Sequence, residues 1–363
     1  MQSNPLTLAS NVDAVTADGP GRDTALRETL RLLDAYMQDR TITEICINRP
    51  GEIFTESNFG WQRHDAPAAS LAWCRKLAQL TATFSAQKIN EKDPILSGVL
   101  PDGERVQILV PPAVEHGTVS VTIRKPSFKA MTPEELEDDG LTDDVADQLS
   151  ALALDEEQLL LLKTERRFWE FFELAVRSKK NIVISGATGA GKTTLARTLL
   201  NYIPTHERII TIEDVREMFL PNHGNRVHLL YSDGGSGTSD VTAKILLQSC
   251  LRQKPDRILL AEIRSKVAYD YIVNTSSGHP GSITTTHAGT CTEAFEMLML
   301  RMKESDEGRE LSRGDIMSLL RAKIDIVIQL QVFDALGSDG QMRKKRRITE
   351  IYYDPAHKRA QLV

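Results

Sequence analysis

The chain contains, at positions 186–194, the sequence Gly186-Ala187-Thr188-Gly189-Ala190-Gly191-Lys192-Thr193-Thr194. It matches the G-x-x-x-x-G-K-[ST] phosphate-binding loop. Residues 181–185 before it are mostly apolar and β-branched and predict a strand, whereas residues 195–200 after it predict a helix. In this context, backbone N–H groups and the positive end of the helix dipole bind phosphate. We therefore expect all nine residues of the loop to contact a nucleoside triphosphate, with Lys192 at the β- and γ-phosphates and the Thr193 hydroxyl on Mg²⁺.

Composition and charge are those of an ordinary soluble globular protein. A length of 363 residues suggests about two domains, and 41% of the residues are hydrophobic and 26% charged. The net charge of −6 gives no overall attraction to nucleic acid or anionic lipid, so direct nucleic-acid binding is not expected. The first residues are too polar for a signal peptide, and no apolar run approaches the roughly 18 residues of a membrane span. The four cysteines lie far apart without a C-x-x-C pair, which predicts buried thiols in the cytoplasm and no zinc site.

The amino-terminal part predicts a small α+β domain at residues 23–127, preceded by a flexible terminus at residues 1–22. Apolar residues recur at helical spacing between positions 26 and 37, and again between positions 71 and 84. Four shorter segments have the alternation or the turn boundaries of strands: residues 42–48, 52–55, 105–110 and 118–124.

Residues 128–165 form a strongly acidic segment that we interpret as a linker. A short helix is expected to begin in it, with Thr132 as the cap and Pro133 at the first helical position. A docking tail is the alternative interpretation of the acidic run, but a solvated linker is the more ordinary one.

Residues 166–363 alternate strands with helices, which predicts a mainly parallel sheet covered by helices and therefore an α/β domain. Ligands of such sheets bind at the carboxyl ends of the strands, where the phosphate loop lies. The basic run at residues 343–347 opens the last strand and suits an exposed edge as well as it suits a membrane or nucleic-acid contact. The expected strands are residues 181–185, 209–212, 227–230, 258–261, 282–286, 324–330 and 348–353.

Acidic residues end two of the apolar strands downstream of the phosphate loop. Glu213 and Asp214 follow one strand, and Glu262 follows another. Hydrolysis requires a carboxylate that orients water and a metal ion that neutralises charge, so these are the catalytic candidates. Ala261 occupies the place where an aspartate commonly precedes the glutamate. The metal ion would therefore be held through water by Glu262 or by the first pair, and the division of roles among the three stays open.

A glycine- and threonine-rich segment at residues 277–290 carries two histidines. His287 lies where a strand runs out into a glycine turn on the nucleotide side, so we expect it to sense the γ-phosphate by hydrogen bonding. His279 is a weaker candidate for the same role. Zinc binding is not expected, because neither a cysteine nor a third ligand lies at metal-binding spacing.

Three of these segments resemble the secretion traffic ATPases: residues 211–216 their Asp box, residues 261–264 their atypical Walker B segment, and residues 278–290 their His box. Residues 42–52, 100–107 and 117–127 resemble the VirB-eleven type specifically, the hexameric ATPases of type IV secretion and conjugation. The resemblance covers residues 25–363, nearly the whole chain.

This resemblance implies a hexamer made of one ring of amino-terminal domains and one ring of RecA-like domains, with nucleotide between the two domains. It implies Mg²⁺-dependent ATP hydrolysis that powers substrate translocation or pilus assembly at the cytoplasmic face of the bacterial inner membrane. The implied partners are inner-membrane channel components and other secretion ATPases, and any membrane association is peripheral.

The resemblance also nominates arginines for the phosphates. Arg105 and Arg124 fall in the matching amino-terminal segments, and Arg252 and Arg264 are further candidates. A mobile domain that carries an arginine would couple charge loss at hydrolysis to rigid-body movement. The long acidic linker resembles that of the subgroup in which neighbouring subunits exchange domains, and both arrangements stay open.

Three other functions compete with a secretion motor. A nucleotide-gated assembly scaffold with incidental hydrolysis stays open because position 261 is an alanine and not an aspartate. A pilus or type II secretion ATPase is disfavoured, because many of these carry a four-cysteine zinc insertion that the sequence lacks. A nucleic-acid motor is disfavoured by the net negative charge.

Overall fold

The computed structural model describes residues 21, 23–126, 131–143, 145, 152–232, 237–264, 266–275, 278–336 and 341–360. Of the expected flexible terminus at residues 1–22, all but residue 21 lie outside the described residues. Within the described part of the chain, no helix is both long enough and apolar enough to cross a membrane.

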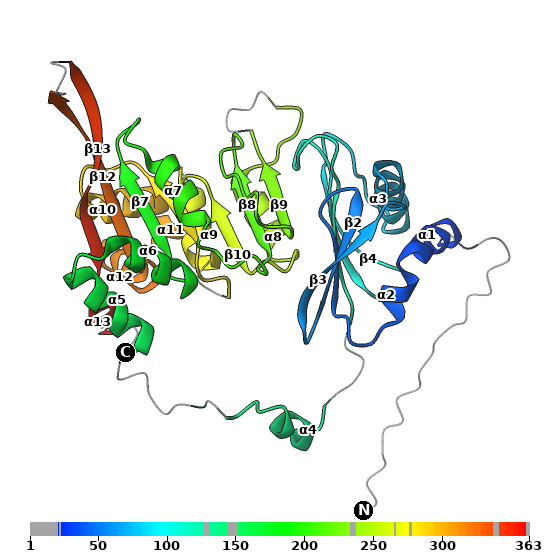
Figure 1. The fold of residues 1–363 in the computed structure, drawn as a ribbon. Helices are drawn as coiled ribbons and strands as arrows, with labels where there is room; N and C mark the ends of the chain where they lie inside the picture. Colours follow the sequence, from blue (N-terminus) through cyan, green and yellow to red (C-terminus); the bar gives the residue numbers. More distant parts are fainter. Residues whose placement is uncertain are drawn as a thin grey trace, which may run out of the picture.

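The amino-terminal domain is an antiparallel six-stranded sheet in the order β3-β2-β1-β6-β5-β4, with helices packed against it (Figure 1). Its buried core joins Leu26 and Leu33 of the first helical segments to Leu77 of α3 and to Ile45 and Ile108 of the sheet. The strands are β1 (Glu44–Ile47), β2 (Gly51–Ser57), β3 (Gly60–Ala66), β4 (Ile95–Val99), β5 (Arg105–Leu109) and β6 (Ser120–Arg124). The helices are α1 (Thr24–Leu30), η1 (Arg31–Leu33), α2 (Asp34–Gln38) and α3 (Leu71–Phe84). This confirms the predicted α+β class.

The second domain has the predicted α/β architecture, built from parallel strands in the orders β10-β8-β9 and β11-β7-β12, with β13 added antiparallel to β12. The two sets adjoin where the Thr285 hydroxyl donates to the carbonyl of Ala261 at 2.9 Å. The strands are β7 (Ile182–Gly186), β8 (Ile209–Glu213), β9 (Arg226–Leu230), β10 (Arg257–Leu260), β11 (Ile283–Thr286), β12 (Ile326–Leu336) and β13 (Met342–Tyr353).

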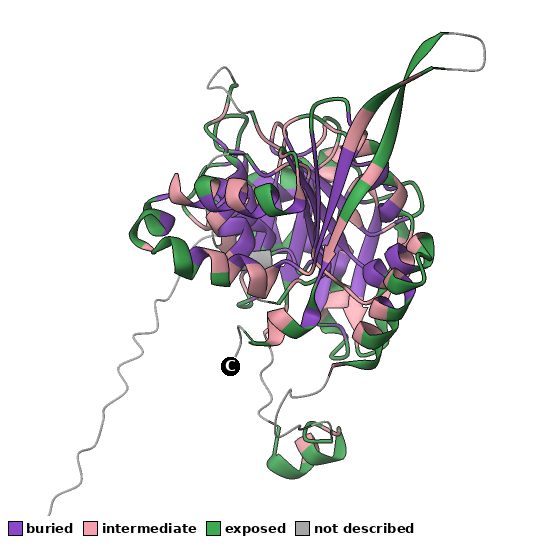
Figure 2. Ribbon diagram, turned by 90° about the vertical axis from the view of Figure 1, so that its left-hand side faces the viewer, coloured by how far each residue is buried: buried purple, intermediate pink, exposed green. Residues whose placement is uncertain are grey.

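Helices cover both faces of this sheet. Along β7, Ile182 and Ile184 point into one buried cluster and Val183 into the other, as the alternation of a strand requires. The first cluster includes α5 (Leu154–Thr164), α6 (Phe168–Arg177) and α7 (Lys192–Leu200). The second includes α8 (Ala243–Cys250), α9 (Val267–Thr275), α10 (Cys291–Lys303) and α12 (Arg313–Lys323). Two short helices complete the domain, α11 (Asp306–Glu310) and α13 (Pro355–Ala360). The purple strands between two helical layers in Figure 2 show this sandwich.

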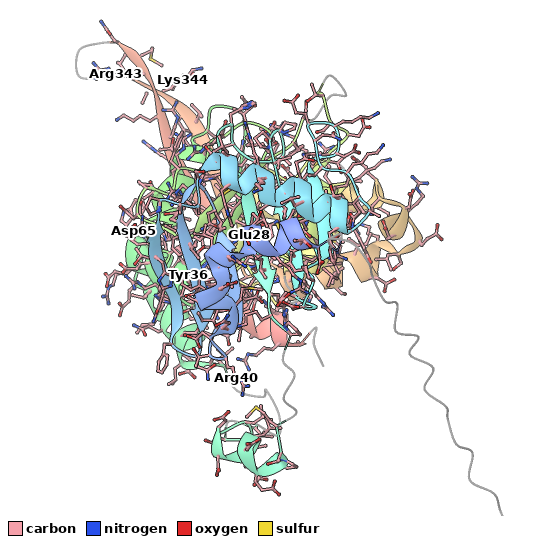
Figure 3. All side chains as sticks on the ribbon, turned by 90° about the vertical axis from the view of Figure 1, so that its right-hand side faces the viewer. Glu28, Tyr36, Arg40, Asp65, Arg343 and Lys344 are labelled. Carbon is pink, nitrogen blue, oxygen red and sulfur yellow. The ribbon has the colours of Figure 1, made fainter. Side chains whose placement is uncertain are left out.

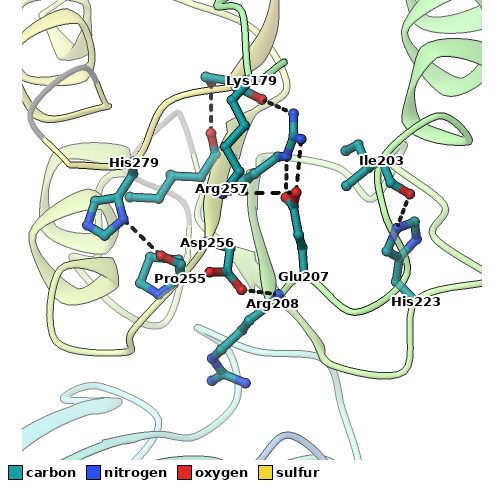
Figure 4. A network of polar contacts seen from close by, with 12 residues as sticks. Lys179, Ile203, Glu207, Arg208, His223, Pro255, Asp256, Arg257 and His279 are labelled. Carbon is teal, nitrogen blue, oxygen red and sulfur yellow. Dashed lines mark hydrogen bonds and ion pairs between the residues drawn. The ribbon is translucent and has the colours of Figure 1, made fainter. Parts of the chain in front are cut away.

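Because β7, β8, β10 and β11 are parallel, their carboxyl ends lie on one edge of the sheet and their amino ends on the other. The carboxyl edge carries the phosphate loop after β7, the acidic ends of β8 and β10, and the histidine after β11. The amino edge carries a separate polar network (Figure 4), in which Arg257 forms an ion pair with Glu207 at 2.5 Å.

In its described residues, the acidic segment contains one isolated helix and one packed helix. α4 (Pro133–Asp138) begins with the predicted cap, because Thr132 and Glu135 form a reciprocal capping box, and it lies apart from both domains in Figure 1. α5 packs instead on α6 and buries Leu159 and Leu162. The core of the second domain therefore includes a helix that precedes its expected start at residue 166.

The basic run at residues 343–347 lies on β13, in the long β12–β13 hairpin that projects from the body of the domain (Figures 1 and 2). Arg343 and Lys344 lie near the end of this projection (Figure 3). The alternation of the strand separates the run into two faces, one with Lys344 and Arg346 and the other with Arg343, Lys345 and Arg347.

The two domains contact each other along β9. Residues 113 and 114 of the amino-terminal domain bind the outer edge of β9, through a hydrogen bond from the Leu230 amide to the Ala113 carbonyl at 2.9 Å and a bridge between Val114 and Leu229. The fully buried Arg208 adds hydrogen bonds to Asn48 at 2.7 Å and to Thr122 at 3.3 Å. Part of the amino-terminal domain thus completes the hydrophobic core of the second domain.

Candidate active site

The phosphate loop follows the fully buried strand β7, and α7 begins directly at Lys192. Gly191 caps the helix with φ of +94°, a left-handed conformation that favours glycine. At Gly186, with φ of +158°, a Cβ atom would lie only 2.6 Å from the carbonyl oxygen of Leu330. The loop therefore has the backbone path that its sequence predicts. A side chain at Gly186 or Gly191 would disturb this path.

Lys192 turns back over the loop. Its Nζ donates to the carbonyl oxygens of Gly186 at 2.8 Å and Ala187 at 3.1 Å, and lies 3.3 Å from Nδ1 of His287. Burial lowers the pKa of Lys192, and the nearby carboxylate of Glu262 opposes that shift. The lysine side chain is thus held against the loop, with its ammonium group next to His287.

Four more of the predicted residues join this group. His287 Nε2 lies 3.1 Å from Glu262 Oε1, and Arg264 forms ion pairs with Glu262 at 2.7 Å and with Asp214 at 2.5 Å. Lys192, His287, Glu262, Arg264 and Asp214 therefore form one continuous set of contacts beside the phosphate loop. It combines what phosphoryl transfer requires, namely cations for the developing charge and carboxylates that can orient water or a metal ion.

Glu213 is close in sequence to this group, but its side chain is fully buried and faces inward. Its Oε2 accepts hydrogen bonds from the amides of Glu217 at 2.6 Å and Met218 at 2.7 Å, and Oε1 accepts from the Thr211 hydroxyl at 2.7 Å. Burial raises the pKa of Glu213, but hydrogen bonds from His228, Thr211 and the two amides outweigh it and bring the pKa below its usual value. Glu213 thus organises the segment that follows it.

That segment places Glu217, which sequence analysis missed, beside the phosphate loop. The Thr193 hydroxyl donates to Glu217 Oε2 at 3.0 Å, and Arg197 Nε donates to the Glu217 carbonyl at 2.6 Å. The segment taken as the Asp box stopped at residue 216, one residue short of Glu217. The available signal was a second glutamate four residues after Glu213, which a tight loop turns back toward α7.

Arg346 was also missed as a site residue. Its Nε donates to the Gly189 carbonyl at 2.9 Å. A Cβ atom added to Gly191 would lie 3.0 Å from the Cδ of Arg346, so this side chain lies directly over the loop. The residue belongs to the basic run that the sequence placed on an exposed strand. Only the pairing of Arg346 with Val332 brings this member of the run over the phosphate loop.

Arg105, Arg124 and Arg252 are not brought to the phosphate loop of their own chain. They line a cavity of about 510 Å³ between the two domains, together with Lys254 and His279. His279 Nδ1 contacts the carbonyl of Pro255, which precedes β10 at the amino edge of the sheet (Figure 4). Since the loop lies at the carboxyl edge, these residues and His279 are separated from it by the length of the strands.

The residues present fit Mg²⁺ with a nucleotide. A hydroxyl from Thr193 and carboxylates from Glu217 and Glu262 are oxygen donors of the kind that Mg²⁺ prefers. Among the described residues, no three His, Cys, Asp or Glu side chains gather into a group that could hold a metal ion. A cation at this edge would therefore rely on phosphate oxygens from the nucleotide for its remaining ligands.

Comparison with known proteins agrees with this geometry. Residues 30–353 match the family described as type II/IV secretion system protein. The chain is 44% identical to the type IV secretion system protein VirB11 of Bartonella quintana, over 91% of this chain and 93% of the relative, and 39% identical to PtlH of Bordetella pertussis, over 92% and 96%.

Among solved structures, the chain matches the VirB11 ATPase of the Brucella suis type IV secretion system, crystallised with sulphate. The TM-score is 0.86 and the identity 44%, over 94% of this chain and 98% of the other. The phosphate loop, the acidic residues beside it and His287 thus occur in a chain that matches these relatives over nearly its full length. The chain belongs to the type II/IV secretion system protein family, and within it to the VirB11 type IV secretion ATPases.

Proposed function

We propose that the chain is a Mg²⁺-dependent ATPase that works as a hexameric ring and powers substrate translocation or pilus assembly in a type IV secretion or conjugation system. One observation carries the proposal: the contacts that link Lys192, His287, Glu262, Arg264 and Asp214 beside the phosphate loop. The membership in the VirB11 ATPases supports the secretion role.

Each residue of the site has a distinct chemical task in this proposal. The loop amides and Lys192 would bind the phosphates of ATP. The Thr193 hydroxyl, Glu217 and, through water, Glu262 would hold Mg²⁺, which would supply positive charge to neutralise the phosphates. Glu262 orients the attacking water, and His287 lies between it and Lys192, where it responds to loss of the γ-phosphate. Asp214 holds Arg264 in place.

Arg105, Arg124 and Arg252 act on the nucleotide of a neighbouring subunit in this proposal. All three are exposed, and they gather in one cavity on the side of the sheet away from their own phosphate loop. Guanidinium groups form strong, geometrically specific hydrogen bonds with phosphate. A ring in which each chain offers these arginines to the next would couple hydrolysis to movement between subunits.

Membership in the family supports a proposed setting for the machine. The ring would work at the cytoplasmic face of the inner membrane with channel components and other secretion ATPases. Its association with the membrane would be peripheral and mediated by these partners.

The test is the ATPase rate as a function of protein concentration, with particle mass measured in parallel, for the wild type and Lys192→Ala. We expect the rate per subunit to rise as a particle of six subunits forms, and Lys192→Ala to assemble without turnover. Turnover of the Lys192→Ala variant at the wild-type rate would refute the assignment of the loop.

A nucleotide-gated scaffold is the second candidate, because Ala261 occupies the place of an expected acidic residue. In that case turnover would stay negligible in the assembled ring, while bound ATP would still promote assembly.

A further inference from the structure

A loop of the amino-terminal domain, residues 110–118, is fixed against the second domain. Ala113 and Val114 are buried in the same cluster as Leu229 of β9, and the Ala113 carbonyl accepts a hydrogen bond from the Leu230 amide at 2.9 Å. This anchoring places Glu115, the next residue, beside the segment between Glu213 and Met218 that follows β8. There Glu115 Oε1 accepts a hydrogen bond from Nη1 of Arg216.

Arg216 contacts the second domain as well as Glu115 of the amino-terminal domain. Its Nη2 lies 3.3 Å from Nε2 of His228, and His228 Nδ1 lies 2.8 Å from the Thr211 hydroxyl. Because the guanidinium can only donate, His228 Nε2 must accept and its Nδ1 must carry the proton. Thr211 in turn donates to Glu213 at 2.7 Å. The contacts thus run without a break from the amino-terminal domain to the buried carboxylate.

The same segment ends at the phosphate loop. Glu213 accepts from the amide of Glu217, and the Glu217 side chain accepts from the Thr193 hydroxyl at 3.0 Å. Arg216 is the residue directly before Glu217, so the position of its guanidinium constrains the backbone that carries Glu217. Among the described residues, no hydrogen bond or ion pair joins Glu115 to the phosphate loop, so its influence there must pass through Arg216.

The position of the Arg216 guanidinium depends on the negative charge of Glu115, because other positive charges lie nearby. Burial lowers the pKa of the neighbouring Arg226, and the nearby charges of Arg49 and Arg216 lower it further, whereas the charge of Glu115 opposes this effect. Without the Glu115 carboxylate, the contacts that the described residues leave to the Arg216 guanidinium are the imidazole of His228 and a Phe219 ring 5.5 Å away, next to another arginine. The guanidinium would then favour solvent over its present position.

We propose that Glu115 is a positioning residue for ATP hydrolysis: through Arg216 it holds the 214–218 segment so that Glu217 lies on the Thr193 hydroxyl. The amino-terminal domain thereby contributes to the phosphate site of its own chain without contacting the nucleotide. This inference rests on the proposed ATPase function.

The test compares Glu115→Gln, Arg216→Gln and the double variant in the full-length assembled protein. The measurements are kcat and KM for ATP, affinity for a fluorescent ATP analogue, and particle mass. Glu115→Gln is expected to lower kcat about tenfold while changing KM and analogue affinity less than twofold. The kcat of the double variant is expected to fall no further than that of the more impaired single variant, because the two substitutions remove the same constraint. Glu115→Asp, which keeps the charge, is expected to retain most of the rate.

Arg49→Gln is the matched control. Arg49 also joins the domains, by donating to the Gly224 carbonyl at 2.8 Å, but within the described part of the chain no side-chain hydrogen bond connects it to Arg216 or Glu213. Its kcat is expected within twofold of the wild type. If Glu115→Gln turns over at the wild-type rate, or if its loss appears in analogue affinity or mass instead of kcat, the inference is wrong while the proposed function stands. A wild type that binds the analogue but does not hydrolyse ATP would overturn both.

Discussion

Glu217 accepts a hydrogen bond from the hydroxyl of Thr193 at 3.0 Å, so the carboxylate lies against the loop hydroxyl that we propose as a ligand of Mg²⁺. Glu217 therefore belongs to the same site as Thr193, although the two residues follow different strands. Both belong to the carboxyl edge of the sheet, where the helix α7 starts and the segment after β8 turns back.

Glu217→Gln is expected to lower kcat about 100-fold and to change the affinity for a fluorescent ATP analogue only a few-fold, because the amide keeps the shape and loses the charge needed for metal and water. Glu173→Gln, on the exposed face of α6, removes a surface carboxylate and is the control. Comparable kcat values for the two variants would remove Glu217 from the catalytic group.

Arg346→Ala is expected to raise the KM for ATP about fivefold to tenfold with a smaller effect on kcat, because Arg346 supports the loop through Gly189 and not the carboxylates. Arg347→Ala is the matched control, since Arg347 is the next residue of the same run and its guanidinium lies instead over the Phe333 ring. Steady-state kinetics at constant ionic strength distinguish the two. Equal KM changes would indicate that the charge of the hairpin matters and not the contact with Gly189.

Much of this arrangement could be predicted from local sequence. Strand β7 and the loop after it were predictable because a β-branched run, glycines and a lysine specify their own backbone path. His287, Glu262 and Asp214 were predictable because parallel strands end on one edge. β3 was missed because it is a largely exposed, polar strand without a hydrophobic alternation.

The rest depended on contacts between segments distant in the chain. Arg346 reaches the loop through the register of β13 on β12, and Glu217 through a turn stabilised by the buried Glu213. The separation of Arg105 and Arg124 from the loop of their own chain depends on which edge of the second domain the first domain contacts, which no single motif encodes.

Glu44 should make stability depend on pH near neutrality. Burial raises its pKa to about 7, against 4.5 for an exposed glutamate, although Arg124 opposes the shift. The folded state then binds the proton more tightly than the unfolded state, so the free energy of unfolding falls as pH rises from about 4.5 to about 7. Glu44→Gln removes this penalty, and it should exceed the wild type in stability at pH 8 by at most about 3 kcal/mol and converge with it near pH 4.5.

Urea unfolding of both proteins between pH 4.5 and 8 measures this difference. Glu56→Gln, on the neighbouring strand β2, is the control, since its carboxylate pairs with Lys254 at 3.0 Å. A wild type that gains stability relative to Glu44→Gln as pH rises would show that the Arg124 charge outweighs burial.

The location of Arg124 on the side of the sheet away from its own phosphate loop predicts complementation between inactive subunits. Lys192→Ala and Arg124→Ala should each have little activity alone, the first through its own loop and the second through the site of its neighbour. In rings formed after mixing equal amounts under exchange conditions, about a quarter of the sites should pair an intact loop with an intact arginine. Activity should therefore recover toward about a quarter of the wild-type rate. If Arg124 serves the loop of its own chain, mixing would recover nothing, because no site would then contain both intact groups.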